Sequence, residues 1–213
     1  MKQLNKIVVV LVVSLILTGC NNAVERTNRL ITLLQENITA IVNELTEIQL
    51  AENNLQAEFE TTLDSGSDDF SGFMSNDSPI QQNIQRRKDH LSKLDEHRND
   101  LLSLIEEVEN QSAKTPLPVE QVNSHISQLN GLAEELSIYI IDYSANMDTE
   151  SIIYKSLANP ETDYTSFFSV FDRVAVLQTT NNINLERILG FFEPINTQLI
   201  NFKVYLANLQ ENN

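Results

Sequence analysis

The only cysteine of the 213-residue chain, Cys20, carries its clearest chemistry. It ends the tetrapeptide Leu17-Thr18-Gly19-Cys20, in which one apolar and two small residues precede the thiol. This is the pattern of a lipobox, where the thiol receives a diacylglyceryl group and the chain is cut before the cysteine. Two acyl chains anchor a protein stably to a bilayer, so we predict that the mature chain is held on a membrane by Cys20.

The residues before Cys20 have the parts of a secretory signal peptide. Lys2 and Lys6 supply a positive start, and residues 7–17 form an apolar run with one serine in it. That run has the length of a signal-peptide core and is too short to span a bilayer. The predicted organisation is a signal peptide over 1–19, the lipidated cysteine and a short tether over 20–27, and an extracytoplasmic helical domain over 28–213. The predicted location is the outer face of the cytoplasmic membrane.

The composition and charge of the chain exclude some classes of binding partner and indicate its secondary structure. Removal of Lys2 and Lys6, the only charged side chains of residues 1–19, changes the formal charge from −16 to −18. Such an acidic surface argues against nucleic acid, anionic headgroups and anionic wall polymers, unless divalent cations bridge to the polymers. Five glycines, five prolines and no tryptophan favour helices over a β-sandwich.

Apolar residues recur at alternating spacings of three and four in four long segments, which is the heptad pattern of coiled coils. The expected helices cover residues 24–63, 79–111, 122–158 and 163–209. The last would be roughly 70 Å long at 1.5 Å per residue, and we expect Gly190 and Pro194 to kink or interrupt it. The predicted fold is all-α: an elongated antiparallel helical bundle or coiled coil of about four long helices.

Charged residues interrupt the apolar seams of the first two helices: Glu52 in the first, and Arg87 and Arg98 in the second. If Phe59 faces Ile80, the same register places Glu52 opposite Arg87. We therefore predict a hydrogen-bonded Glu52–Arg87 pair that fixes the register of this hairpin. Breaking a truly buried pair of this kind costs about 3–5 kcal/mol.

The stretch 64–78 has the Asp, Ser and Gly content of a loop, and Ser78 before Pro79 predicts an N-cap and the start of the next helix. Three of its residues are large and apolar: Phe70, Phe73 and Met74. They would form either an exposed contact patch or, as we favour, a cap on the open end of the helical core.

The remaining polar residues predict no catalytic or metal site. His90 and His97 lie seven apart and His125 is on another helix, so we expect surface histidines rather than a zinc site. Four acids of the loop could offer oxygen ligands to Ca²⁺, but they lack the spacing of an EF-hand, so a cation site is the less favoured interpretation. They are Asp64, Asp68, Asp69 and Asp77. No Gly-x-Ser-x-Gly or phosphate-binding loop occurs in the sequence. We predict a protein that is not an enzyme and uses no cofactor.

One stretch is locally basic, with Arg86, Arg87, Lys88, Lys93 and Arg98 close together. It could meet an anionic partner. The favoured interpretation is that it pairs with acids of neighbouring helices.

The chain resembles the YkyA-like cell-wall-binding lipoproteins of low-GC Gram-positive bacteria. The likeness rests on the lipobox, on the run Leu45-Thr46-Glu47-Ile48-Gln49-Leu50-Ala51-Glu52-Asn53-Asn54-Leu55 and on residues 70–91. That family tends to be rich in lysine and glutamate, whereas this chain is poor in lysine and rich in asparagine. The resemblance implies wall binding and carries no catalytic motif onto these residues.

Together these patterns favour a non-enzymatic surface lipoprotein whose helical domain contacts the cell wall, with peptidoglycan as one expected partner. The alternative is an adaptor or regulator that binds another envelope protein through coiled-coil faces. A homo-oligomer built through the same faces also stays open, and a wall hydrolase is the least favoured interpretation.

Overall fold

The computed structural model describes residues 2–65, 70–159 and 161–211, with side chains from residue 23 onward. These residues form helices and short connections, and no strand occurs among them, so the all-α prediction is confirmed. The α-helices are α1 (Lys2–Asn53), α2 (Leu55–Ser65), α3 (Pro79–Gln111), α4 (Val119–Lys155) and α5 (Tyr164–Glu211). Three short 3-10 helices join them: η1 (Ser71–Met74), η2 (Ser112–Lys114) and η3 (Ser156–Ala158).

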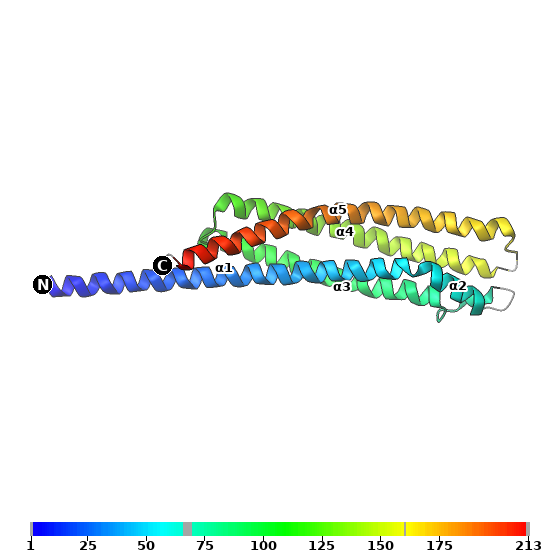
Figure 1. Ribbon diagram of the computed structural model, residues 1–213, viewed down its shortest axis with the longest axis horizontal. Helices are drawn as coiled ribbons and strands as arrows, with labels where there is room; N and C mark the ends of the chain where they lie inside the picture. The colour runs from blue at the N-terminus through cyan, green and yellow to red at the C-terminus, as the bar shows by residue number, and fades with distance from the viewer. Residues whose placement is uncertain (1, 66–69, 160, 212–213) are drawn as a thin grey trace.

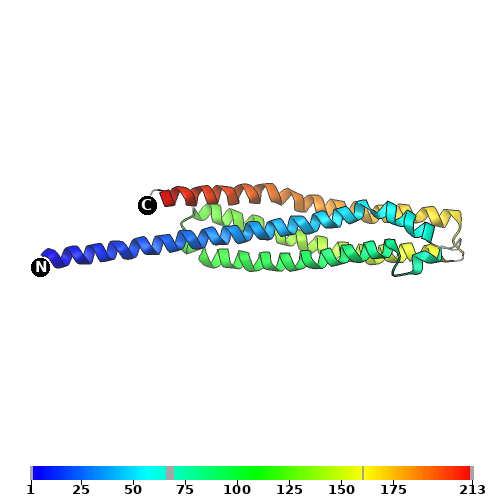
Figure 2. The same ribbon diagram turned by 60° about the horizontal axis from the view of Figure 1, so that its bottom comes forward.

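The four long helices lie side by side, each antiparallel to the next along the chain (Figures 1 and 2). Both termini lie at one end of the molecule, and α1 projects beyond the other helices there (Figure 1). The opposite end, which we call the far end, contains α2, η1, η3 and the start of α5. Cross-helix hydrogen bonds join Asn37 to His97, Arg98 to Ala133, and Asn146 to Asn181.

The apolar seams become the core of the protein. Their residues pack in one continuous cluster along the four helices, because a 3.5-residue repeat keeps one face of each helix turned toward its neighbours. The seam residues that α1 and α2 contribute are all buried, and Val24 of α1 joins them: Ile31, Leu34, Ile38, Ile41, Leu45, Ile48, Leu55 and Phe59.

The start of α3 follows the predicted capping chemistry. Ser78 is extended, its Oγ accepts a hydrogen bond from the Gln81 amide at 3.4 Å, and Pro79 takes the first helical position. The end of α3 at Gln111 also agrees with the prediction.

The first predicted helix is in fact two helices, because α1 ends at Asn53 and α2 begins at Leu55. The reason lies on α3. The Asn83 side-chain amide donates to the Ala51 carbonyl at 2.7 Å, while the Asn54 amide closes a tighter turn onto that same carbonyl at 3.2 Å. A side chain that inserts into the backbone ladder in this way is a common cause of a helix break. The Thr62 hydroxyl then accepts from the Ile80 amide at 3.1 Å, which ties α2 to α3.

We expected Gly190 and Pro194 to kink or interrupt the last helix. The structure shows no interruption, because α5 continues through both residues. Near this part of α5, a glycine of α4 lets the two helices pack closely. A Cβ added to Gly131 of α4 would lie 2.7 Å from the Phe191 ring of α5, so glycine permits this helix contact.

The lipobox residues Leu17, Thr18, Gly19 and Cys20 belong to α1, and their side chains lie outside the described part of the structure. The expected tether over 20–27 is helical as well, and Val24 is already buried within it. Among the residues whose side chains are described, no helix combines the length and the hydropathy needed to cross a membrane.

Candidate functional site

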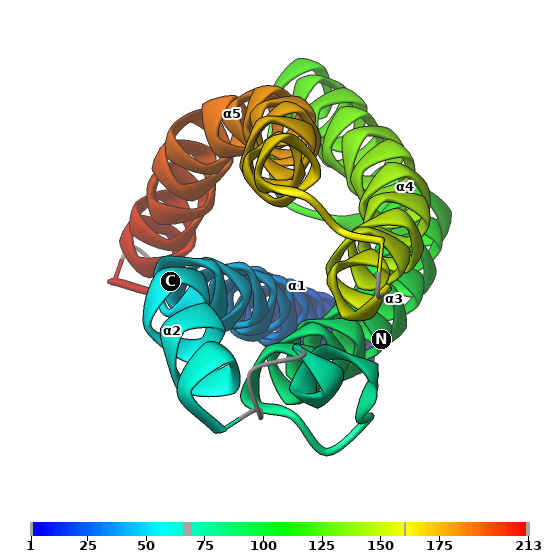
Figure 3. The ribbon, with the colours of Figure 1, turned by 90° about the vertical axis from the view of Figure 1, so that its right-hand side faces the viewer.

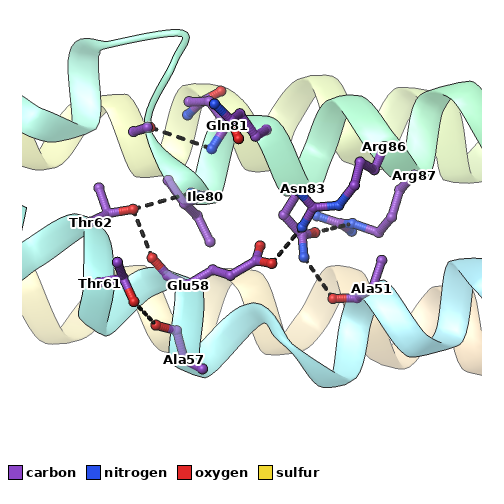
Figure 4. A network of polar contacts seen from close by, with 12 residues as sticks. Ala51, Ala57, Glu58, Thr61, Thr62, Ile80, Gln81, Asn83, Arg86 and Arg87 are labelled. Carbon is purple, nitrogen blue, oxygen red and sulfur yellow. Dashed lines mark hydrogen bonds and ion pairs between the residues drawn. The ribbon is translucent and has the colours of Figure 1, made fainter.

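Arg87 of α3 is the centre of a set of buried polar contacts. Its guanidinium is fully buried, and Nη1 and Nη2 donate to the two carboxylate oxygens of Glu150 on α4, at 2.9 and 2.6 Å. Its Nε donates to Asn83 Oδ1 at 2.8 Å, and Asn83 donates onward to the Ala51 carbonyl (Figure 4). A bidentate pair with an occupied Nε holds the guanidinium in one orientation. We call Glu52, Asn83, Arg87, Tyr143, Glu150 and Asn181 the polar layer.

Arg87 therefore hydrogen-bonds the Glu150 carboxylate and not that of Glu52, so the predicted direct Glu52–Arg87 pair is wrong. The Tyr143 hydroxyl stands between them. It accepts from Arg87 Nη1 at 3.2 Å and donates to Glu52 Oε1 at 2.7 Å. The Asn181 side chain of α5 also acts on Glu52 and lowers the pKa of its carboxyl, so the polar layer involves all four long helices. The prediction considered the first hairpin alone, whereas α4 supplies the nearer carboxylate.

In the polar layer, burial and neighbouring charges have opposite effects on the pKa values of Arg87 and Glu52. Burial has the largest single effect and alone would lower the pKa of Arg87, but the Glu150 carboxylate and the Tyr143 hydroxyl together outweigh it and raise the pKa of the guanidinium. Burial raises the pKa of the Glu52 carboxyl above its usual value, and the Tyr143 hydrogen bond and Arg87 offset only part of that shift. The layer is an ion-pair network whose members are buried, except that Glu52 is partly exposed.

Aromatic rings fill the far end. Phe59 of α2 has the Phe73 and Phe171 rings 5.0 Å away, and the Tyr154 ring at 5.9 Å. Phe73 is fully buried and caps the core, as we favoured. Phe70 is partly buried, with its ring 5.7 Å from Phe167.

Met74, the third apolar residue of the predicted loop patch, is 60 % exposed and does not join the cap. Phe70 also has a φ of 55°, in the left-handed region that phenylalanine rarely adopts. The three residues therefore have different environments: Phe73 and Phe70 pack over the end of the core, and Met74 faces solvent. Asp68 and Asp69 of the same stretch lie outside the described residues.

The start of α5 presents aromatic side chains to solvent. Tyr164 is 80 % exposed and Phe171 43 % exposed, and Phe168 is about half exposed with its ring 4.6 Å from Tyr164. The heptad seam had assigned Tyr164 and Phe171 to the core. Four aromatic residues within residues 164–171 exceed what one seam can bury, and this excess is the sequence signal for an exposed patch.

A groove of about 470 Å³ lies at the far end, between α2 and α5, with Tyr154 of α4 beside it. Figure 3 views this end of the molecule, with α2 and the start of α5 toward the viewer. Its lining combines apolar side chains, two amides and one carboxylate: Leu55, Gln56, Phe59, Glu60, Tyr154, Phe171, Val174, Ala175 and Gln178. Such a lining suits a ligand with apolar faces and uncharged hydrogen-bonding groups.

His125 does not lie on the surface as predicted, because it is buried against Phe202 at the other end of the molecule. Neither ring nitrogen has a hydrogen-bond partner in the described structure. Burial lowers the pKa of His125 to about 4, so the ring is neutral in the folded protein. A cavity of about 30 Å³ borders it.

His90 pairs with Glu44, with Nδ1 and Oε2 2.7 Å apart. Within the part of the chain that the structure describes, no group of three or more His, Cys, Asp or Glu side chains is placed to hold a metal ion.

The basic stretch pairs across helices, as favoured. Arg86 contacts Glu58 of α2 and Lys88 contacts Asp148 of α4, each at 2.5 Å. Arg98 instead donates to the Ala133 carbonyl at 3.0 Å.

Comparison with known proteins gives one family. Residues 23–175 match the family YkyA, described as "Putative cell-wall binding lipoprotein". The matched range includes Phe59, Tyr154 and Phe171 of the groove. No curated protein and no solved structure match the chain.

Proposed function

Because the chain belongs to the YkyA family of cell-wall binding lipoproteins, we propose that it is a non-catalytic surface lipoprotein that contacts the wall through its far end. A diacylglyceryl group on Cys20 anchors it to the outer face of the cytoplasmic membrane. The observation that carries the proposal is the exposed aromatic surface of the far end, at the end of the molecule opposite α1's start.

The anchor and the far end are separated by the length of the helices. We propose that the four long helices act as one elongated antiparallel bundle of the coiled-coil type. The 48 residues of α5 give a length of roughly 70 Å. Val24 is buried only four positions after Cys20, so the lipid holds this end close to the bilayer and the far end points toward the wall.

A binding role suits the chemistry of the far end. The buried charges of the polar layer are committed to one another, and the accessible groove is lined by aromatic and amide side chains. Aromatic side chains give large contact area at low conformational cost and are enriched in recognition surfaces.

A second function has its own supporting observation. The outer face of α5 exposes a stripe of Val176, Ile183 and Val204, at spacings that are multiples of seven. Such a stripe matches the face that a partner helix covers in a coiled coil. The alternative is therefore an adaptor that binds an envelope protein along α5, and crosslinking on intact cells would identify that protein.

Co-sedimentation with purified wall sacculi tests wall contact. We expect saturable binding that persists, or strengthens, after anionic wall polymers are stripped, because the mature chain has a formal charge of −18. Assays with and without Ca²⁺ show whether cations bridge the acidic surface to the polymers. Absence of binding to every sacculus preparation would contradict the proposal and favour the adaptor.

Replacement of the anchor cysteine tests the membrane attachment. Cys20→Ala should abolish lipid addition, and the protein should leave the membrane fraction or keep an uncleaved signal peptide. Fractionation with immunoblotting measures both. Thr18→Ala, which keeps a small residue before the cut, is the matched control and should behave like the unaltered protein. Unchanged retention and processing of Cys20→Ala would refute lipidation.

A further inference from the structure

We propose that the groove between α2 and α5 binds an uncharged acetamido sugar of a wall glycan strand. The inference rests on the proposed wall contact and names its ligand class. It follows from the size of the groove, the position of its aromatic rings, its paired amides and its charge.

The groove has the dimensions and the preformed floor of a ligand site. Its volume of about 470 Å³ lies within the range of roughly 300–1,000 Å³ typical of small-molecule pockets. Phe59 and Tyr154 are buried at its base, while Phe171 stands exposed at its side. The Phe59 and Phe171 rings meet edge to face at 5.0 Å, which fixes their orientation. The exposed Phe171 ring offers a flat apolar surface to the C–H face of a pyranose or to an acetyl methyl group, and the buried Phe59 and Tyr154 rings support it from below.

Two amides face the groove from different helices. Gln56 of α2 donates from Nε2 to Glu60 Oε1 at 3.0 Å, and its carbonyl oxygen remains as an acceptor. Gln178 of α5 is half-buried, and its side-chain amide makes no hydrogen bond within the described part of the chain. An acetamido group has one N–H donor and one C=O acceptor, so it matches a donor and an acceptor supplied by side-chain amides.

The charge of the groove selects against anionic ligands. Glu60 is the one charged residue of the lining, which has no Lys, Arg or His. A phosphate-rich polymer would therefore meet a carboxylate with no compensating cation, on a protein that is acidic overall. A sugar hydroxyl, in contrast, donates to a carboxylate oxygen, so Glu60 favours neutral sugars.

The test uses the full-length, processed protein in detergent with the tetramer of N-acetylglucosamine as the probe, measured by calorimetry. We expect saturable binding. Gln178→Ala should weaken it roughly fivefold to tenfold, the loss that one hydrogen bond produces, and Phe171→Ala should weaken it at least as much. Gln198→Ala is the matched control, since this partly buried amide lies on the same helix outside the groove lining and donates to Gln121 Oε1. The tetramer of glucose, which lacks the acetamido group, should bind at least about tenfold more weakly.

Several results would overturn the inference. They are no binding of the acetamido tetramer, equal binding of the glucose tetramer, or unchanged binding in both groove variants. A dimer that dissociates in Phe171→Ala, without sugar binding, would assign the groove to a second copy of the chain. Circular dichroism checks that each variant is folded.

Sacculi stripped of anionic polymers separate this inference from the proposed function. If the groove variants bind stripped sacculi as well as the unaltered protein does, wall contact stands and the groove inference fails. If the unaltered protein binds the tetramer but no sacculi, wall contact fails while the groove is a sugar site.

Discussion

Replacement of Arg87 with methionine should lower the free energy of unfolding by about 3–5 kcal/mol. The guanidinium is fully buried and makes the two hydrogen bonds that neutralise the Glu150 carboxylate, whose side chain is almost as buried. Methionine has a similar length but donates no hydrogen bond, so Glu150 would remain buried and unpaired. The Tyr143 hydroxyl and Asn83 Oδ1 would each lose a donor as well.

Urea unfolding at neutral pH measures this loss, and the neighbouring residue provides a matched control. Arg86 is 47 % exposed in its side chain and pairs with Glu58 at the surface, so Arg86→Met should cost less than about 1 kcal/mol. The double variant Arg87→Met, Glu150→Leu should recover most of the stability, because apolar residues can replace a buried pair at little cost. If Arg87→Met costs no more than Arg86→Met, the polar layer is not a stabilising network.

The polar layer also shows how far the sequence could predict this site. Glu52 and Arg87 were visible as charged positions in mostly apolar seams, and both do lie in the layer. Glu150 was visible in the same way, because it occupies the seam position between Met147 and Tyr154 of its own helix. The sequence did not show which of these charged residues pair with one another. A heptad pattern shows which face of a helix is buried, but it does not show which residue of a third helix faces it, so the pairing of Arg87 with Glu150 depended on how α4 packs against α3.

The break between α1 and α2 had the same kind of cause. The apolar seam runs through Leu55 and Phe59 without a change of phase, so the sequence predicted one helix. The interruption depends on the Asn83 amide, which reaches the Ala51 carbonyl from α3. Element identity and the Ser78 cap were local and predictable, whereas the break and the opening of the groove beside α2 depended on tertiary contacts.

We expect the free energy of unfolding to fall in mild acid, because His125 is buried in its neutral form. Its folded pKa of about 4 lies below the ordinary value of 6.5. Between these values the unfolded chain binds a proton that the folded chain does not, so stability falls as the pH drops from about 6.5 toward 4. The full shift corresponds to about 3 kcal/mol. The cavity beside the ring is lined by apolar or uncharged side chains, among them Thr27, Gln111, Thr115 and Phe202.

His125→Leu separates this effect from the other titrating groups. Its free energy of unfolding should exceed that of the unaltered protein by about 1 kcal/mol at pH 7.5, because two buried nitrogens without partners are removed. The stability advantage of His125→Leu should grow by about 3 kcal/mol by pH 4.

Glu52 has the opposite effect on the pH dependence of stability, since its raised pKa makes the folded state take up a proton first as the pH falls. That contribution is shared by both proteins and cancels in their difference. Urea unfolding at pH 7.5, 5.5 and 4.5 gives the comparison, and a constant difference across this range would show that the His125 ring is protonated equally in the folded and unfolded states.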